Sequence, residues 1–152
     1  MKNLFLYLFI LTSWFIGGFL FRDTTNFYNK LNLPFFALPG FLYGIVWTIL
    51  FIMISYSIYL VFKENKNNIP GSYLIVLILN YIINQTYTLF LFNFKNLFLS
   101  FINTILILIT TLILYDQTKK INEKASKFLI PYLLFSIFAV ILSLTIYFMN
   151  IN

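Results

Sequence analysis

The chain has 152 residues, of which 61% are hydrophobic and only 9% are charged, and its net charge is +6. This composition excludes a soluble domain, because a soluble domain of this size must cover its core with polar side chains. The cations are spread over short segments, which excludes a nucleic-acid interface. The chain contains no Cys and no His. No thiol chemistry is therefore expected, and we predict no metal site and no acid–base catalytic centre.

Five apolar stretches without charged residues predict one all-α membrane domain over 1–152. Each has about 18 to 22 residues, which at about 1.5 Å per residue crosses a hydrocarbon core of about 30 Å. The first stretch has an alternative interpretation as a cleaved signal peptide, but no small-residue cleavage site follows it. We therefore predict a bundle of five transmembrane helices, with spans at 4–21, 41–62, 73–92, 97–115 and 128–149.

The cations between the spans predict the orientation in the membrane. Cytoplasmic segments are enriched in Lys and Arg. The N-terminus and the second and fourth loops carry seven cations, Lys2, Lys63, Lys66, Lys119, Lys120, Lys124 and Lys127, whereas the other side carries three, Arg22, Lys30 and Lys95. The N-terminus is therefore predicted to be cytoplasmic. The abundance of Phe, Ile, Asn, Lys and Tyr is typical of an AT-rich genome and indicates a bacterial cell membrane.

The first loop, from Arg22 to Gly40, is the longest connection and is rich in aromatic residues. Its segment NFYNKLNL predicts a short amphipathic turn. Pro34 and Pro39 then hold the chain extended, and Gly40 frees the backbone directly before the second span. So many aromatic side chains would be costly to leave in water. The loop is therefore predicted to fold over the end of the bundle as a lid, whereas the fourth loop, DQTKKINEKASK, is predicted to be polar and solvated.

Polar residues in the third span are candidates for a site. Asn80, Asn84, Tyr87 and Thr88 share one face of a helix, and Gln85 lies beside them. Amides inside membranes often form hydrogen bonds between helices. The alternative is a pocket wall that offers amide donors and acceptors to a ligand. The two interpretations are compatible if only part of the stripe reaches a cavity.

Aromatic residues in the second and fifth spans complete the candidate cavity. Trp47 and Phe51 lie one helical turn apart, as do Phe135 and Ala139. Trp47 lies about two turns inside the second span, which is deeper than an interface residue requires. An aromatic cavity with a few amides suits a flat or bulky apolar ligand that carries some polar groups at its edge.

The segment FYNKLNLPFFALPGFLYGIVWTILF resembles the first loop and second helix of the tryptophan-rich sensory protein family, also called the translocator protein or peripheral-type benzodiazepine receptor family. The family pattern is WY-x-x-L-x-x-P-x-x-x-P-P-G-x-x-x-G-x-x-W. The segments NYIINQTYTLFLFNFKN and LIPYLLFSIFAVILS are similar to its third and fifth helices, so the resemblance covers essentially the whole chain. The residues in register with the first pattern are Tyr28, Leu31, Pro34, Pro39, Gly40, Gly44 and Trp47.

The resemblance implies a five-helix membrane protein, commonly a homodimer, that binds porphyrins, sterols and benzodiazepine-type drugs beneath its first loop. Porphyrin would be a ligand rather than a cofactor, and lipid and the hydrophobic ligand would be the partners. Pro34, Pro39 and Gly40 would belong to the lid. By motif position, the ligand would contact Tyr28, Trp47, Phe51, Asn84, Phe135 and Ala139, with Asn80 and Gln85 as neighbours.

The sequence departs from the family at several tryptophan positions. Phe27, Phe41 and Phe135 stand where the family often has Trp. Phe keeps a flat apolar wall, but it lacks the indole N–H and the low oxidation potential of Trp. A binding, transport or sensing protein is therefore favoured over a light-dependent porphyrin-degrading enzyme, for which Trp47 would be the remaining catalytic candidate. A third interpretation is a scaffold that binds other membrane proteins.

Overall fold

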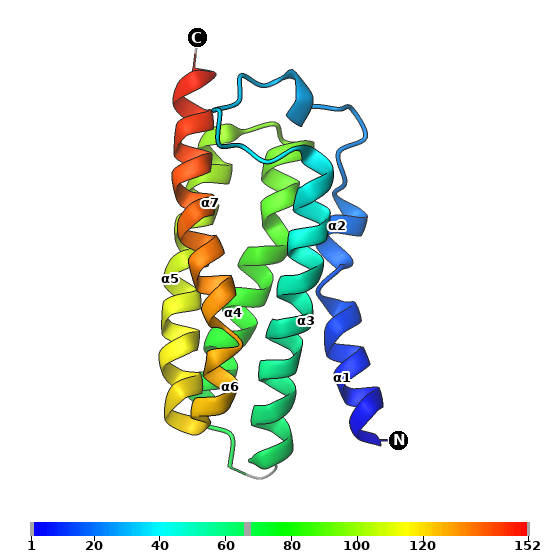
Figure 1. Ribbon diagram of the computed structural model, residues 1–152, viewed down its shortest axis with the longest axis vertical. Coiled ribbons are helices and arrows are strands. Elements are labelled where there is room, and N and C mark those ends of the chain that lie inside the picture. Colours follow the sequence, from blue (N-terminus) through cyan, green and yellow to red (C-terminus); the bar gives the residue numbers. More distant parts are fainter. Residues whose placement is uncertain (1, 66–67, 152) are drawn as a thin grey trace.

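The computed structural model describes residues 2–65 and 68–151. Lys66, one of the cations used to predict orientation, lies outside the described residues. The regular elements are helices that run side by side along the longest axis of the molecule (Figure 1). They are α1 (Lys2–Ser13), α2 (Ile16–Leu20), the 3-10 helix η1 (Tyr28–Lys30), α3 (Gly40–Glu64), α4 (Gly71–Thr88), the π-helix η2 (Leu89–Asn93), α5 (Leu97–Ile121), α6 (Glu123–Lys127) and α7 (Ile130–Met149).

Four of the predicted spans are confirmed as helices that are long and apolar enough to cross a membrane, at Gly40–Glu64, Gly71–Asn93, Leu97–Ile121 and Glu123–Met149. Proline marks the starts of three of them, because its fixed φ suits the entry to a helix and its missing N–H costs no hydrogen bond there. Pro39 and Pro70 directly precede α3 and α4, and α7 has a proline in its first turn. The starts are therefore set by local sequence.

The helices pack around a core in the middle of the bundle. α5 packs against α4 and α7, α1 packs against α3, and α2 packs against α4. Ile54 and Val61 of α3, Leu114 of α5 and Tyr132 of α7 are at most 1% exposed and belong to one hydrophobic cluster. The short connection between η2 and α5 makes α4 and α5 antiparallel neighbours, as the sequence predicts.

The first predicted span is not one continuous helix. α1 ends at Ser13 and α2 begins at Ile16, so residues 4–21 are interrupted at Trp14 and Phe15. At the break, the N–H groups of Trp14 and Phe15 donate to carbonyl oxygens three residues earlier, at 3.2 Å each. The N-terminal segment is therefore a shorter apolar helix over Leu4–Ser13 that continues, past the break, into α2.

Side chains of α4 explain why this break is tolerated. The hydroxyl of Tyr81 donates to the Ser13 carbonyl at 2.9 Å, and Gln85 Nε2 donates to the Trp14 carbonyl at 3.1 Å. Gln85 Oε1 also accepts the Gly17 N–H. Backbone that is not helical inside a membrane protein must have its polar groups bonded by neighbouring protein, and α4 supplies those bonds.

The predicted polar loop over 116–127 is wrong. α5 continues to Ile121, and α6 begins at Glu123 directly after Asn122. Ion pairs between residues four apart, Lys120 with Asp116 and Lys127 with Glu123, favour helix on both sides of the bend. Asn122 Oδ1 accepts the Ala125 N–H at 2.9 Å and caps α6. Charge alone indicated a loop, whereas the spacing of the charges permits helix.

The first loop crosses the end of the bundle at which the C-terminus lies (Figure 1). Its predicted short turn is confirmed as η1. Pro34 is buried, and Pro39 is exposed directly before α3. The expectation that the loop shelters its aromatic side chains fails at Phe35, which is 100% exposed. The loop therefore covers the bundle with part of its length and presents an aromatic side chain outward with another.

Candidate functional site

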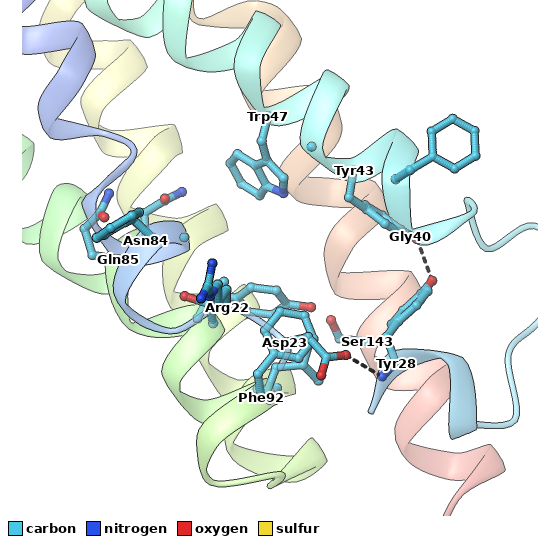
Figure 2. A pocket seen from close by; sticks show the side chains of 18 of the residues that line it. Arg22, Asp23, Tyr28, Gly40, Tyr43, Trp47, Asn84, Gln85, Phe92 and Ser143 are labelled. Carbon is cyan, nitrogen blue, oxygen red and sulfur yellow. Dashed lines mark hydrogen bonds between the residues drawn. The ribbon is translucent and has the colours of Figure 1, made fainter. Parts of the chain in front are cut away.

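A cavity of about 730 Å³ lies beneath the first loop, among α2, α3, α4, η2, α5 and α7. Cavities that hold small organic molecules commonly measure about 300–1,000 Å³. The wall is mainly apolar, and polar groups interrupt it at a few points. Aromatic side chains reach the cavity from several elements, including Phe19, Phe41, Tyr43, Tyr87 and Phe92. Figure 2 shows this lining from close by.

The structure brings together most of the predicted site residues. Tyr28, Trp47, Phe51, Asn84 and Gln85 all line the cavity, and so does the predicted lid residue Gly40. The remaining predicted residues, Asn80, Phe135, Ala139, Pro34 and Pro39, are not among its lining residues.

Phe135 and Ala139 lie behind Trp47. They line a separate space of about 40 Å³, which Trp47 also lines. The Trp47 and Phe135 rings meet edge to face, with centroids 5.4 Å apart. Trp47 therefore borders both spaces, and Phe135 and Ala139 line only the smaller one.

The polar stripe of α4 divides between packing and cavity. Asn80 is fully buried, and its Nδ2 donates to the hydroxyls of Thr110 and Thr111 at 2.9 and 3.0 Å. The Tyr132 hydroxyl donates to Asn80 Oδ1 at 3.2 Å and accepts from Asn84 Nδ2 at 3.0 Å. The helix-to-helix interpretation is thus confirmed for Asn80, whereas Asn84 both joins this network and reaches the cavity.

Gln85 lines the cavity, yet both ends of its amide are already bonded. Oε1 accepts the Gly17 N–H and Nε2 donates to the Trp14 carbonyl, so the amide bridges the break between α1 and α2. Thr88, one turn further along α4, donates to the Gly17 carbonyl at 3.2 Å. The structure therefore gives Gln85 a role in holding the cavity wall, which its sequence position alone did not indicate.

Asp23 organises the first turn of the loop. Its Oδ1 accepts the N–H groups of Thr25 and Phe27, and its Oδ2 accepts the N–H of Tyr28, at 3.0 Å each. Burial raises the pKa of Asp23, but these hydrogen bonds stabilise the carboxylate and outweigh it, so the pKa lies below its usual value. The ionised side chain fixes the position of Tyr28 over the cavity (Figure 2).

Tyr28 joins the loop to the start of α3. Its hydroxyl donates to the Leu38 carbonyl at 3.1 Å and lies 3.1 Å from the Tyr43 hydroxyl. The two rings meet edge to face at 5.5 Å. Burial, together with the hydrogen bond to Tyr43, raises the pKa of Tyr28 above its usual value. The hydroxyl therefore stays protonated at neutral pH and keeps its hydrogen bond to the Leu38 carbonyl.

A second attachment holds the middle of the loop, and the sequence did not reveal it. The Asn32 N–H donates to Asn150 Oδ1 at 2.9 Å, and Asn150 Nδ2 donates back to the Asn32 carbonyl at 3.0 Å. Asn32 Nδ2 also donates to the Met149 carbonyl at 3.3 Å. The loop is thus fastened to the end of α7, more than one hundred residues away along the chain.

Comparison with known proteins agrees with this architecture. Residues 5–149 match the model of the TspO/MBR family. The chain belongs to this family. It is 35% identical to the tryptophan-rich protein TspO of Bacillus cereus over 152 residues, which cover 99% of each chain. It is 37% identical to the uncharacterized membrane protein YtaB of Bacillus subtilis over 135 residues, which cover 89% of this chain and 87% of that protein.

A more distant relative is the tryptophan-rich protein TspO of Archaeoglobus fulgidus, 26% identical over 149 residues, or 93% of this chain and 92% of the relative. The family resemblance seen in the sequence is thereby confirmed, and the chain is an integral membrane protein with bacterial and archaeal relatives.

Both tryptophans of this family member lie in the cavity wall. The Trp14 ring stacks on Phe51 with centroids 5.5 Å apart, and Trp47 lies against the same ring at 5.4 Å. Trp14 is only 2% exposed. Its position at the helix break brings it into the site, and a sequence interpretation that treats residues 4–21 as one continuous helix gives no reason to place it there.

Proposed function

We propose that this chain binds flat, largely apolar molecules of the porphyrin type in the cavity beneath its first loop, for transport or sensing. Drugs of the benzodiazepine type would occupy the same cavity. The observation that carries the proposal is the stacked cluster of Trp14, Phe51 and Trp47 in the wall of a space of about 730 Å³. Aromatic faces attract flat conjugated ligands by stacking and exclusion of water.

The experiment is a titration of protoporphyrin IX into purified protein in neutral detergent, followed by quenching of tryptophan fluorescence. Wild type should saturate, and Phe51→Ala should raise Kd about tenfold, since an aromatic contact contributes on the order of 1 kcal/mol. Phe148→Ala is the matched control, because Phe148 is 64% exposed on α7 and does not line the cavity. Quenching equal to that of free tryptophan added to empty micelles would refute the proposal.

The lid, the fifth span and the dimer belong to the same proposal. The first loop would act as a lid that closes the cavity at its fastened end, and α1 with α2 would form an interrupted fifth span. The N-terminus would be cytoplasmic.

A homodimer would form through helix faces that are apolar and exposed in one chain, for example along α4 at Ile75, Ile78 and Ile82.

A second candidate function is light-dependent degradation of bound porphyrin. The observation that favours it is the presence of two indole rings in the cavity wall, Trp14 and Trp47. Bound protoporphyrin should then bleach faster under light and oxygen than the free pigment and give a defined product. If Trp14→Phe and Trp47→Phe both bleach at the wild-type rate, the tryptophan mechanism is wrong.

A further inference from the structure

Arg22 is the cation of the cavity. It follows α2 by two residues and lines the space beneath the loop, where Figure 2 shows it among the labelled side chains. Arg22 and Asp23 are the charged members of the lining in the described part of the chain. A guanidinium stays ionised at any physiological pH and carries donors arranged to grip a carboxylate with two parallel bonds. Arg22 is exposed, and from the rim of the cavity its guanidinium can pair with an anionic group of a ligand.

None of the acidic side chains within residues 2–65 and 68–151 supplies that partner. It has four carboxylate side chains. The Asp23 oxygens accept three backbone N–H groups of the loop. Glu64 accepts from Asn122, and the other two acids pair with lysines four residues away. Arg22 has no hydrogen bond and no ion pair with any residue between 2 and 65 or between 68 and 151.

The fold places the three remaining acids far from Arg22. Glu64 ends α3, and Asp116 and Glu123 lie at the α5–α6 junction, at the end of the bundle opposite the first loop (Figure 1). The loop end instead carries further positive charge. Lys30 lies in η1, and Lys95 Nζ lies 5.7 Å from the centroid of the Phe27 ring in the loop. The electrostatic field at this end therefore favours an anion.

The other polar residues of the cavity wall are uncharged, among them Asn84, Thr88 and Ser143. They can exchange hydrogen bonds with a ligand, but they cannot neutralise a charge. A charged ligand would therefore be orientated, with its apolar body against the aromatic wall and its charge at the loop end.

We propose that the cavity selects amphipathic carboxylates, whose flat apolar body lies among Trp14, Trp47 and Phe51 and whose carboxylate pairs with Arg22 beneath the loop. This inference rests on the proposed function and gives it a chemical class of ligand: a flat organic acid is bound, and its neutral ester is bound less well. Arg22 is then a specificity residue. The sequence interpretation missed it because Arg22 counted only as a loop charge.

The test compares protoporphyrin IX, which carries two carboxylates, with its neutral dimethyl ester. Both are titrated into wild type, Arg22→Gln and Lys30→Gln in a neutral maltoside detergent. Lys30→Gln is the matched control, because it removes one positive charge from the same loop at a residue that does not line the cavity. Arg22→Gln should weaken binding of the diacid up to about fivefold, since a charge pair at an exposed residue is worth up to about 1 kcal/mol.

The ester and the control decide the interpretation. The ester should bind wild type and Arg22→Gln equally, Lys30→Gln should match wild type for both pigments, and Arg22→Lys should recover part of the diacid affinity. Equal weakening of acid and ester by Arg22→Gln, an unchanged diacid affinity, or the same loss in Lys30→Gln would overturn the inference. If the ester binds saturably and the diacid binds no more tightly than the ester, the proposed function stands without this inference. If neither pigment binds better than to empty micelles, the proposed function fails, and the inference fails with it.

Discussion

Gly17 shows how one residue determines the course of the first membrane segment. A Cβ built on Gly17 would lie 2.6 Å from Gln85 Oε1 and 2.7 Å from the Gln85 carbonyl oxygen. A side chain cannot be accommodated there without moving the α4 backbone. Because Gly17 has no side chain, α2 lies close enough to α4 for Gln85 and Thr88 to form hydrogen bonds with the Gly17 backbone. The neighbouring Gly18 has open space at the same position.

Gly17→Ala should therefore destabilise the protein, whereas Gly18→Ala should not. Overpacking against backbone costs about 1–3 kcal/mol, which corresponds to a fall in Tm of about 2 to 10 °C. Gly18→Ala should leave Tm unchanged or raise it slightly, because Ala favours helix more than Gly does. Thermal unfolding of both variants in the same detergent tests this. Equal Tm values for the two variants would mean that the close approach of α2 to α4 is not present.

Asp23 makes the stability of the first loop depend on pH. Its pKa is lower in the folded protein than in the unfolded chain, so its contribution to loop stability is present at pH values above the unfolded pKa of about 3.9. That contribution disappears as the pH falls through the folded pKa and the carboxylate becomes protonated.

Asp23→Asn should therefore speed amide hydrogen exchange at Thr25, Phe27 and Tyr28 at pH 7. At pH 7 these amides should be better protected from exchange in wild type than in Asp23→Asn. This difference in protection should shrink as the pH falls below about 4, because the wild-type side chain then also loses its charge. Comparing the two proteins at each pH removes the intrinsic pH dependence of exchange. Extra protection of the wild-type amides that does not begin to shrink as the pH falls below about 4 would contradict the assigned role of the charge.

At the scale of elements, sequence and structure agree where a residue's role is local and differ where it depends on a neighbour. The starts of α3, α4 and α7 follow from prolines, and the turn η1 follows from its own short segment. The break after Ser13 depends on side chains of α4, and the helical course of 116–127 depends on charges spaced four apart. Asn80 and Asn84 share a stripe in sequence, yet the packing of α5 and α7 leaves only Asn84 at the cavity.

The fastening of the first loop to α7 is another contact between distant elements, and it yields a prediction. Asn150→Ala removes the paired hydrogen bonds with Asn32 and should speed amide exchange across residues 22–40 about fivefold, for a net loss of about 1 kcal/mol. Asn68→Ala, at an exposed position between α3 and α4, is the control and should leave that segment unchanged. If Asn150→Ala exchanges like the control, Asn150 does not hold the loop.

At the scale of the whole molecule, the chain is a family member whose main cavity lies at the end of the bundle that the first loop covers. The sequence predicted much of the cavity wall, because Tyr28, Trp47, Phe51 and Asn84 belong to motifs that fix their positions on the loop, α3 and α4. It did not predict that Phe135 and Ala139 line a separate smaller space, which depends on how the side chains around Trp47 pack. Nor did it predict that no acidic side chain in the described part of the chain pairs with Arg22, which depends on where those carboxylates lie in the fold.

The most direct test fills the cavity and leaves the rest of the molecule as it is. Gly44 lines the cavity, and an added Cβ there meets open space; Gly71, at the start of α4, is equally open but does not line the cavity. Gly44→Leu should raise the Kd for protoporphyrin IX about tenfold or more at an unchanged Tm, while Gly71→Leu should bind like wild type. Wild-type affinity in Gly44→Leu would show that the pigment binds elsewhere on the protein and would contradict the account.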